Sequence, residues 1–237
     1  MNIEDEGILV AKFKYGEGSL ILSIFSKKHG LVKGILKSGT SLKNKAILEI
    51  GNVLKFQKRS RNEEALGFFK VEVEESYLYK IFQFKNKLLA LASICELMAE
   101  FTLEKEVDED FYELSKSTII VLQKEDFIKY YIRWELKLLE KIGIGLDLQK
   151  CVVSKQTENL YYLSPKTGKA VVKEVGLPYA NKLFIIPLLF KNMEAEPTKE
   201  NVFEAFKVLN HFFNMFCNEY HKKMPFARDC LIKNLMD

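Results

Sequence analysis

The sequence predicts an α+β protein in which a small five-stranded β-barrel precedes a mostly α-helical domain that carries a small β-hairpin. Residues 1–75 consist of short apolar runs separated by glycine-bearing turns, which is typical of β-structure. From Tyr77 onward the apolar residues recur at helical spacing. A turn-rich segment at residues 159–172 interrupts the helical pattern. We therefore expect two domains, residues 1–78 and residues 79–237.

The predicted strands cover residues 8–13, 19–25, 31–36, 53–58 and 69–73. In the last of these, Phe69, Val71 and Val73 alternate with charged residues, which predicts one buried face. Closing five short strands into a barrel removes their exposed edges, and the oligonucleotide-binding barrel, or OB-fold, is the expected architecture of this size. An SH3-like barrel has a similar pattern, so it stays open as an alternative.

The predicted helices cover residues 82–103, 110–122, 125–142, 201–220 and 226–235. Glycines at 143 and 145 are typical of the end of a helix. The acidic stretch at residues 108–110 is explained by the favourable interaction of carboxylates with a helix N-terminus. The hairpin at residues 159–172 turns at Ser164-Pro165-Lys166-Thr167-Gly168.

The composition is that of an ordinary globular protein, with 48% hydrophobic and 29% charged residues. No apolar run reaches the roughly 20 residues that a membrane span requires. The acidic start at residues 4–6 is unlike a secretory signal. We therefore expect a cytoplasmic protein without a membrane partner, and we expect its four isolated cysteines to be reduced and mostly buried.

The positive charge is concentrated near the N-terminus. Residues 1–80 contain 14 basic and 10 acidic residues, whereas the remaining 157 residues contain 22 of each. Between Lys27 and Arg61 there are ten basic residues and one acid, Glu49. This asymmetry predicts a polyanion-binding module on a neutral scaffold, although a solvated lysine-rich surface is the simpler alternative. The candidate DNA-binding residues are Lys27, Lys28, Lys33, Lys37, Lys43, Lys45, Lys58, Arg59 and Arg61.

Other kinds of site have little support. Phe56 and Phe68 are the candidates for stacking on bases. His211, Cys217 and His221 share a predicted helix but lack a carboxylate or second cysteine to complete a metal site, so we expect no bound metal. The sequence contains no recognisable nucleotide-binding loop or nucleophile motif, and a metal-dependent nuclease would need clustered carboxylates. We expect neither a catalytic centre nor a cofactor.

Several motifs occur in an order that resembles the bacterial RecO family of recombination mediators. They are Tyr15-Gly16-Glu17-Gly18-Ser19-Leu20, Lys28-His29-Gly30-Leu31-Val32-Lys33-Gly34, Arg133-Trp134-Glu135-Leu136-Lys137-Leu138-Leu139 followed by Gly143, the Ser164–Gly168 hairpin turn, and Met224-Pro225-Phe226-Ala227-Arg228. One departure is that many members of this family carry a four-cysteine zinc site after the position of Cys151, and this chain has no further cysteine before Cys217.

The resemblance implies a DNA-binding OB-fold domain and a helical domain that together act in DNA repair and homologous recombination. A protein of this family would bind single- and double-stranded DNA, anneal complementary strands and, with RecR, help to load the RecA recombinase onto DNA coated by single-strand-binding protein. The acidic tail of single-strand-binding protein would need a cation beside an apolar pocket, for which Arg133 beside Trp134 is the candidate. The alternative is an adaptor whose barrel binds acidic peptides rather than DNA.

Overall fold

The computed structural model describes residues 1–62, 65–192 and 194–236, apart from the side chains of Leu42, Lys43 and Ala46. The chain forms two compact units, one containing residues 1–125 and 225–234 and the other residues 126–224 and 235–237. We describe each unit by itself. Within the described residues, no helix is both long enough and apolar enough to cross a membrane.

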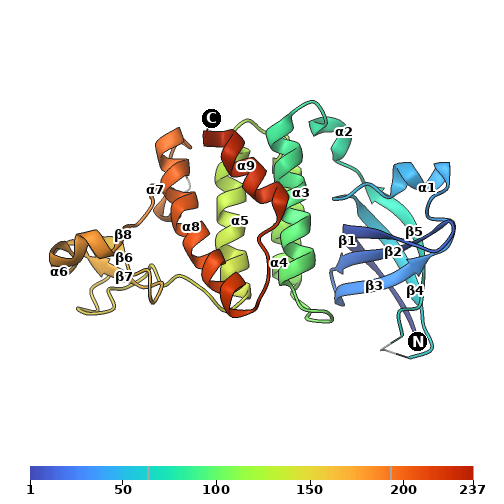
Figure 1. The fold of residues 1–237 in the computed structure, drawn as a ribbon, viewed down its shortest axis with the longest axis horizontal. Coiled ribbons are helices and arrows are strands. Elements are labelled where there is room, and N and C mark those ends of the chain that lie inside the picture. The colour runs from blue at the N-terminus through green and yellow to red at the C-terminus, as the bar shows by residue number, and fades with distance from the viewer. Residues whose placement is uncertain (63–64, 193, 237) are drawn as a thin grey trace. The chain divides into compact units, whose positions relative to one another are not determined.

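A closed β-barrel occupies the N-terminal part of the first unit (Figure 1). Its strands are β1 (Asn2–Tyr15), β2 (Ser19–Ser26), β3 (Gly30–Leu36), β4 (Val53–Arg59) and β5 (Phe68–Glu75). They are joined in the order β1-β2-β3-β5-β4, and β4 also pairs with β1. The barrel closes where Ile35 of β3 pairs in parallel with Phe68 of β5. The predicted OB-fold, with its five strands, is confirmed.

The inner row of each strand fills the barrel. Leu22, Ile24 and Leu54 are completely buried, and Phe69 is nearly so. The alternation predicted for β5 holds at Phe69 and Val71, but Val73 is 44% exposed. A register shift in the β4–β5 ladder lies beside this position, between Val53 and Leu54. The core therefore ends before the alternating sequence pattern does.

A short helix, α1 (Leu42–Ile47), lies between β3 and β4. This helix was not among the elements predicted from the sequence, which had none between the strands at residues 31–36 and 53–58. The Ser41 hydroxyl accepts a hydrogen bond from the Asn44 amide at 3.4 Å, which caps the helix. Ile47, Leu48 and Ile50 then pack against the barrel core. The helix depends on this burial, because six residues are too few to be stable alone.

The first unit also contains α2 (Leu78–Ile81), α3 (Lys85–Phe101), α4 (Glu109–Val121) and nearly all of α9 (Phe226–Met236). The Asp108 carboxylate accepts a hydrogen bond from the Phe111 amide at 2.8 Å, so this acid caps α4 as expected. The Glu96 carboxylate of α3 accepts a hydrogen bond from the Ala227 amide of α9 at 3.1 Å. A domain boundary at residue 78 stays a prediction, since the unit that holds the barrel continues well beyond it.

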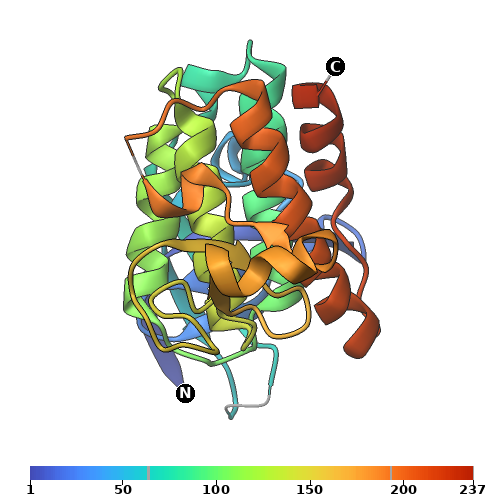
Figure 2. The ribbon, with the colours of Figure 1, turned by 90° about the vertical axis from the view of Figure 1, so that its left-hand side faces the viewer.

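The second unit combines helices with a small sheet. Its main helices are α5 (Phe127–Lys141) and α8 (Lys199–Glu219), which pack together and bring the Tyr131 and Phe206 rings to 6.2 Å between centroids. The predicted hairpin is present as β6 (Leu160–Leu163) and β7 (Ala170–Val172). Four further short elements were not predicted: α6 (Lys173–Gly176), the 3-10 helix η1 (Leu177–Lys182), β8 (Phe184–Ile185) and α7 (Leu188–Lys191). Figure 2 shows the β7-β6-β8 sheet on the side nearest the viewer.

The cysteines occupy mostly apolar surroundings. Cys95, Cys151 and Cys217 are buried and Cys230 is partly buried, so the expectation of mostly buried thiols is confirmed. Burial works to raise the pKa of Cys151, but hydrogen bonds from the Ser154 side chain and from the amides of Ser154, Val172 and Val153 outweigh it and lower the pKa to about 7. The Cys151 sulfur therefore accepts hydrogen bonds from several backbone amides of the second unit.

Candidate nucleic-acid interface

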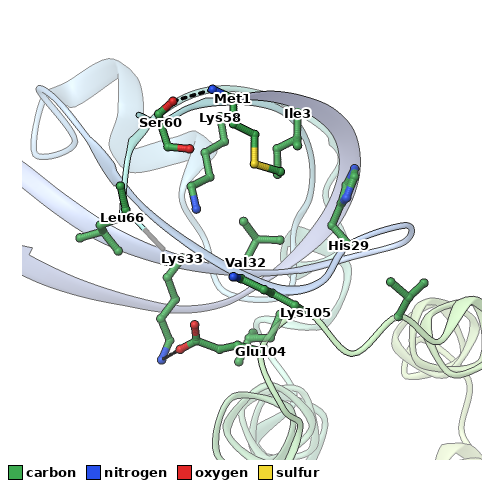
Figure 3. A pocket seen from close by; sticks show the side chains of 13 residues that line it. Met1, Ile3, His29, Val32, Lys33, Lys58, Ser60, Leu66, Glu104 and Lys105 are labelled. Atoms are coloured by element: carbon green, nitrogen blue, oxygen red, sulfur yellow. Dashed lines mark hydrogen bonds and ion pairs between the residues drawn. The ribbon is translucent and has the colours of Figure 1, made fainter. Parts of the chain in front are cut away.

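A pocket of about 350 Å³ opens on the barrel, between β3, the end of β4 and the segment that follows α3 (Figure 3). We call it the barrel pocket. Lys58 projects into its centre, and the Lys105 side chain extends toward the same space. The remaining lining residues are Met1, Ile3, His29, Leu31, Val32, Lys33, Ser60, Ala65, Leu66, Glu104 and Val107. Loops and strand faces of this part of an OB-fold are where oligonucleotides bind in proteins of this architecture.

The position of Lys58 follows from the two-residue period of β4. Leu54, Phe56 and Lys58 belong to one row, and the first two are buried in the barrel. Lys58 lies opposite Ile3 of β1 and Phe69 of β5, so all three side chains share the inner face of the barrel. The apolar row therefore ends with a cation at the open end of the barrel, where it remains partly accessible.

Among the residues that the structure describes, the charges around Lys58 are poorly compensated. Burial lowers the pKa of Lys58, and the nearby charge of Lys105 lowers it further, while Glu104 acts in the opposite direction. The Glu104 carboxylate is itself engaged by Lys33, at 2.7 Å from its Nζ atom. Two cations therefore share a partly enclosed space with a carboxylate that already has a partner. An anionic ligand such as a phosphate would relieve this repulsion.

A second group of residues lies beside the pocket, at the start of β5. Phe68 is 49% exposed, and the Nζ atom of Lys37 lies 4.8 Å from the centre of its ring. Arg59 is exposed and lies directly opposite Phe68 in the β4–β5 ladder. We call Lys37, Arg59 and Phe68 the Phe68 corner. None of these three residues lines the barrel pocket, although Arg59 lies in the sequence between Lys58 and Ser60, which both do.

The structure separates the predicted DNA-binding residues into two groups. Lys28, Lys37, Lys45, Arg59 and Arg61 are exposed, and the structure shows no ion pair between them and a described residue. Lys27 differs, since its Nζ atom lies 2.5 Å from Glu113 and 3.8 Å from Glu6. Lys33 is likewise paired, with Glu104. The side chain of Lys43 lies outside the described residues. The assignment of this set to DNA stays a prediction.

Of the two aromatic candidates, only Phe68 can meet a ligand from solvent. Phe56 is 2% exposed and packs edge-to-face on Phe69 in the barrel core, with 5.4 Å between ring centroids. The stacking role suggested for Phe56 is therefore wrong. The position of Phe56 in β4 explains its burial, because side chains alternate along a strand and Phe56 is two residues from the buried Leu54, in the same inward row.

Three groups of the barrel pocket were not among the sequence candidates. Lys105 follows α3 in a left-handed conformation with φ of 63°, and its amide donates a hydrogen bond to the Leu31 carbonyl at 3.4 Å. His29 lines the same wall, and the Met1 ammonium donates to the Ser60 carbonyl at 2.7 Å. The charge count could not find Lys105, since it lies between Glu104 and Glu106, outside the basic segment.

In the second unit, the candidate partner residues lie in different environments. Arg133 is exposed on α5, whereas Trp134 is completely buried and so cannot offer surface to a partner. A role for Arg133 in binding an acidic tail stays a prediction. His211 contacts the Pro165 carbonyl through Nε2 at 3.0 Å. No group of three or more His, Cys, Asp and Glu residues within the described ranges is placed to hold a metal ion.

The barrel, its basic pocket and the helices define a protein of the OB-fold class joined to an α-helical region. Residues 1–77 match the family model "Recombination protein O N terminal" and residues 86–223 match "Recombination protein O C terminal". The chain therefore belongs to the recombination protein O family, abbreviated RecO.

Curated relatives agree with this assignment over nearly the full chain. The chain is 38% identical over 223 residues to "DNA repair protein RecO" of Rickettsia canadensis, an alignment covering 93% of this chain and 92% of that protein. It is 35% identical over 237 residues to the protein of the same name from Rickettsia bellii, covering 100% and 98%. Among solved structures, Entamoeba histolytica asparaginyl-tRNA synthetase aligns over 69% of this chain and 38% of that chain, with 12% identity and a TM-score of 0.26, which is too low to inform fold or function.

Proposed function

We propose that this chain acts in DNA repair and homologous recombination, and that it binds single- and double-stranded DNA through the barrel pocket and the Phe68 corner. The observation that carries the proposal is the pair of cations, Lys58 and Lys105, which share a partly enclosed pocket in which the described residues offer no free counter-charge. An exposed aromatic ring with two cations beside it, Lys37 and Arg59, lies on the same part of the barrel, where β4 ends and β5 begins. Membership of the RecO family, whose curated relatives are called DNA repair proteins, supports the same ligand.

The proposed binding mode separates two kinds of contact. Lys58 and Lys105 would bind phosphate oxygens, while Lys37 and Arg59 would hold the backbone on either side of Phe68. A base of a single strand would stack on the exposed part of the Phe68 ring. In duplex DNA the bases are already stacked on each other, so the contacts would be mainly to phosphates. Neither mode depends on base sequence.

Strand annealing would follow from the same surface. Two complementary strands repel each other through their phosphates, and a cationic surface lowers that repulsion when it holds both. This activity requires no catalytic group, and we propose that the protein is not an enzyme. In the full reaction it would act with RecR to help load RecA onto DNA coated by single-strand-binding protein, whose acidic tail is proposed to contact Arg133.

The salt dependence of DNA binding tests the barrel pocket. We expect the double variant Lys58→Gln/Lys105→Gln to bind a fluorescein-labelled single-stranded oligonucleotide more weakly than the wild type. Each lost phosphate contact should also reduce the slope of log K against log salt by about 0.7 for a single strand. The readout is fluorescence anisotropy over a series of salt concentrations.

Lys55→Gln is the matched control. Lys55 lies on the same strand, but it faces outward and its Nζ atom is paired with Glu74 at 2.7 Å. We expect this variant to keep the affinity and slope of the wild type. If the pocket variant behaved like the control, the DNA site would not be in the barrel pocket. If the wild-type protein bound no oligonucleotide at any salt concentration, the adaptor that binds acidic peptides would be the better explanation.

A further inference from the structure

A second aromatic and basic surface lies outside the barrel pocket, on the segment between the barrel and α3. Tyr79 is 64% exposed, Phe82 58% and Phe84 52%. Three large aromatic side chains within six residues are thus open to solvent, although burying an aromatic ring is normally favourable. We call residues 79–87 the aromatic turn. Figure 1 shows α2 and the start of α3, which contain it, beyond the end of the barrel strands.

The aromatic turn is basic as well as aromatic. It contains Lys80, Lys85 and Lys87, and the sequence has no acidic residue from position 77 to position 95. The Nζ atom of Lys80 lies 5.5 Å from the centre of the Tyr79 ring, and that of Lys87 lies 4.7 Å from the centre of the Phe84 ring. A cation and an exposed ring are therefore adjacent at two points along the turn.

The lysines of the aromatic turn keep their charge uncompensated by the groups they contact. The Lys85 ammonium donates to the Asn234 side-chain oxygen at 2.6 Å, and the Lys87 ammonium donates to the Gln123 carbonyl at 2.8 Å. Both acceptors are neutral oxygens, in contrast to the carboxylates that engage Lys27 and Lys33 on the barrel. These neutral contacts hold the two side chains in place without cancelling their positive charge.

Buried residues and backbone hydrogen bonds hold the backbone of the aromatic turn in place. Ile81 is completely buried and Tyr77 is 7% exposed, so apolar contacts hold α2 in place. The Phe84 amide donates to the Ile81 carbonyl at 2.9 Å, and the Leu88 amide donates to the Phe84 carbonyl at 3.0 Å as α3 begins. The exposed rings are thus carried on a fixed turn rather than on a free loop, which reduces the entropy lost when a ligand binds.

We propose that the aromatic turn is a second binding site for single-stranded nucleic acid, separate from the barrel pocket. Bases would stack on Tyr79, Phe82 and Phe84, and the adjacent lysines would bind the phosphates between them. An apolar protein surface would match the rings, but it would leave three cations without counter-charge, so the charge pattern favours a nucleic acid. A chain with two separated strand sites could hold two strands at once. The site is argued from its own residues and does not depend on the barrel pocket.

Removing the rings tests this site. We expect Tyr79→Ala/Phe84→Ala to weaken the binding of a fluorescein-labelled poly-dT oligonucleotide by at least about fivefold, the lower end for the loss of one stacked base. The slope of log K against log salt should stay unchanged, because no charge is removed. Lys80→Gln/Lys87→Gln should instead reduce both the affinity and the slope.

Phe203→Ala is the matched control, since Phe203 is 50% exposed on α8, where Glu200 and Glu204 lie beside it together with Lys199. Replacing thymine by photoreactive 5-iodouracil in the poly-dT probe provides a measurement on the wild-type protein, with crosslinks expected at Tyr79, Phe82 or Phe84. If the ring variant bound as tightly as the control and the crosslinks fell elsewhere, the proposal would be overturned and the turn would be a protein-docking surface.

These variants test the barrel pocket and the aromatic turn independently of each other. Weakening by the ring variant with an unaffected Lys58→Gln/Lys105→Gln variant would support the aromatic turn and refute the barrel pocket. The opposite pattern would refute the aromatic turn and support the barrel pocket. Weakening by both variants, with the crosslinks above, would support two strand sites on one chain.

Discussion

Alanine at Gly30 should destabilise the first unit far more than alanine at Gly16, although both glycines have a left-handed backbone. Their φ angles are +64° and +58°, and the conformational penalty for a residue with a Cβ atom is about 1–2 kcal/mol at either position. The surroundings differ. A Cβ atom on Gly30 would lie 2.4 Å from the Glu106 carbonyl oxygen and 2.7 Å from its carbon, whereas one on Gly16 would meet nothing within 4 Å.

The two penalties add at Gly30 because the obstacle is backbone and cannot rotate away. Overpacking of this kind costs about 1–3 kcal/mol, so we expect about 2–5 kcal/mol for Gly30→Ala against about 1–2 kcal/mol for Gly16→Ala. The strain should also displace residues 104–107, which carry Lys105 into the barrel pocket. Oligonucleotide binding should therefore weaken in Gly30→Ala under conditions in which the protein remains folded.

Urea denaturation followed by far-ultraviolet circular dichroism measures the difference between the two variants. The fluorescence of Trp134, the single tryptophan, reports separately on the second unit and provides an internal reference. Equal destabilisation by the two substitutions would refute the reasoning, because the contact between Gly30 and Glu106 would then contribute nothing. Unchanged DNA binding in Gly30→Ala would show that the position of residues 104–107 does not matter to the barrel pocket.

Three further predictions concern single side chains. Tyr112 is completely buried and its hydroxyl has no hydrogen-bond partner among the described residues, so Tyr112→Phe should stabilise the protein by about 1 kcal/mol in urea denaturation, and a loss of stability would reveal a missed partner. The pKa of Cys151 is lowered to about 7 from its usual 9.0, so the ionised thiol contributes stability that is fully present above pH 9 and is lost as the pH falls through 7. Cys151→Ala should remove this part of the pH dependence, and identical pH profiles for variant and wild type would contradict it. Phe56→Ala should cost about 3–5 kcal/mol of stability, because it empties part of the barrel core, whereas Phe68→Ala should leave stability nearly unchanged and weaken oligonucleotide binding. Comparable melting temperatures for these two variants would show that their burial has been misjudged.

The strands and long helices could be predicted from sequence because their signals are local. Glycine-bearing turns separate the barrel strands, and α8 repeats its apolar residues over 21 positions. The short elements could not be predicted. Helix α1 and strand β8 have six and two residues, too few for a period to appear. Their structure depends on packing against residues that are distant in the sequence.

The charge count predicted the basic segment but not which cations are available to a ligand. Lys27, Lys33 and Lys55 are paired with Glu113, Glu104 and Glu74, all of which follow the basic segment in the sequence. A count within residues 27–61 therefore overstates the free positive charge. The two-residue alternation along β4, in contrast, does indicate which side chains face the barrel interior. It assigns Phe56 to the core and places Lys58 in the same inner row.

Helix α9 connects the end of the sequence to its beginning. Glu96 of α3 caps the Ala227 amide, and Asn234 contacts both Lys85 and Asn86, so residues 225–234 complete the unit that contains the barrel. During synthesis the barrel strands leave the ribosome first, whereas the α9 residues that complete their unit are made only after the second unit. A newly made chain would therefore carry an open flank on α3 until α9 has been made, and the whole intervening second unit would have to emerge before that flank is covered.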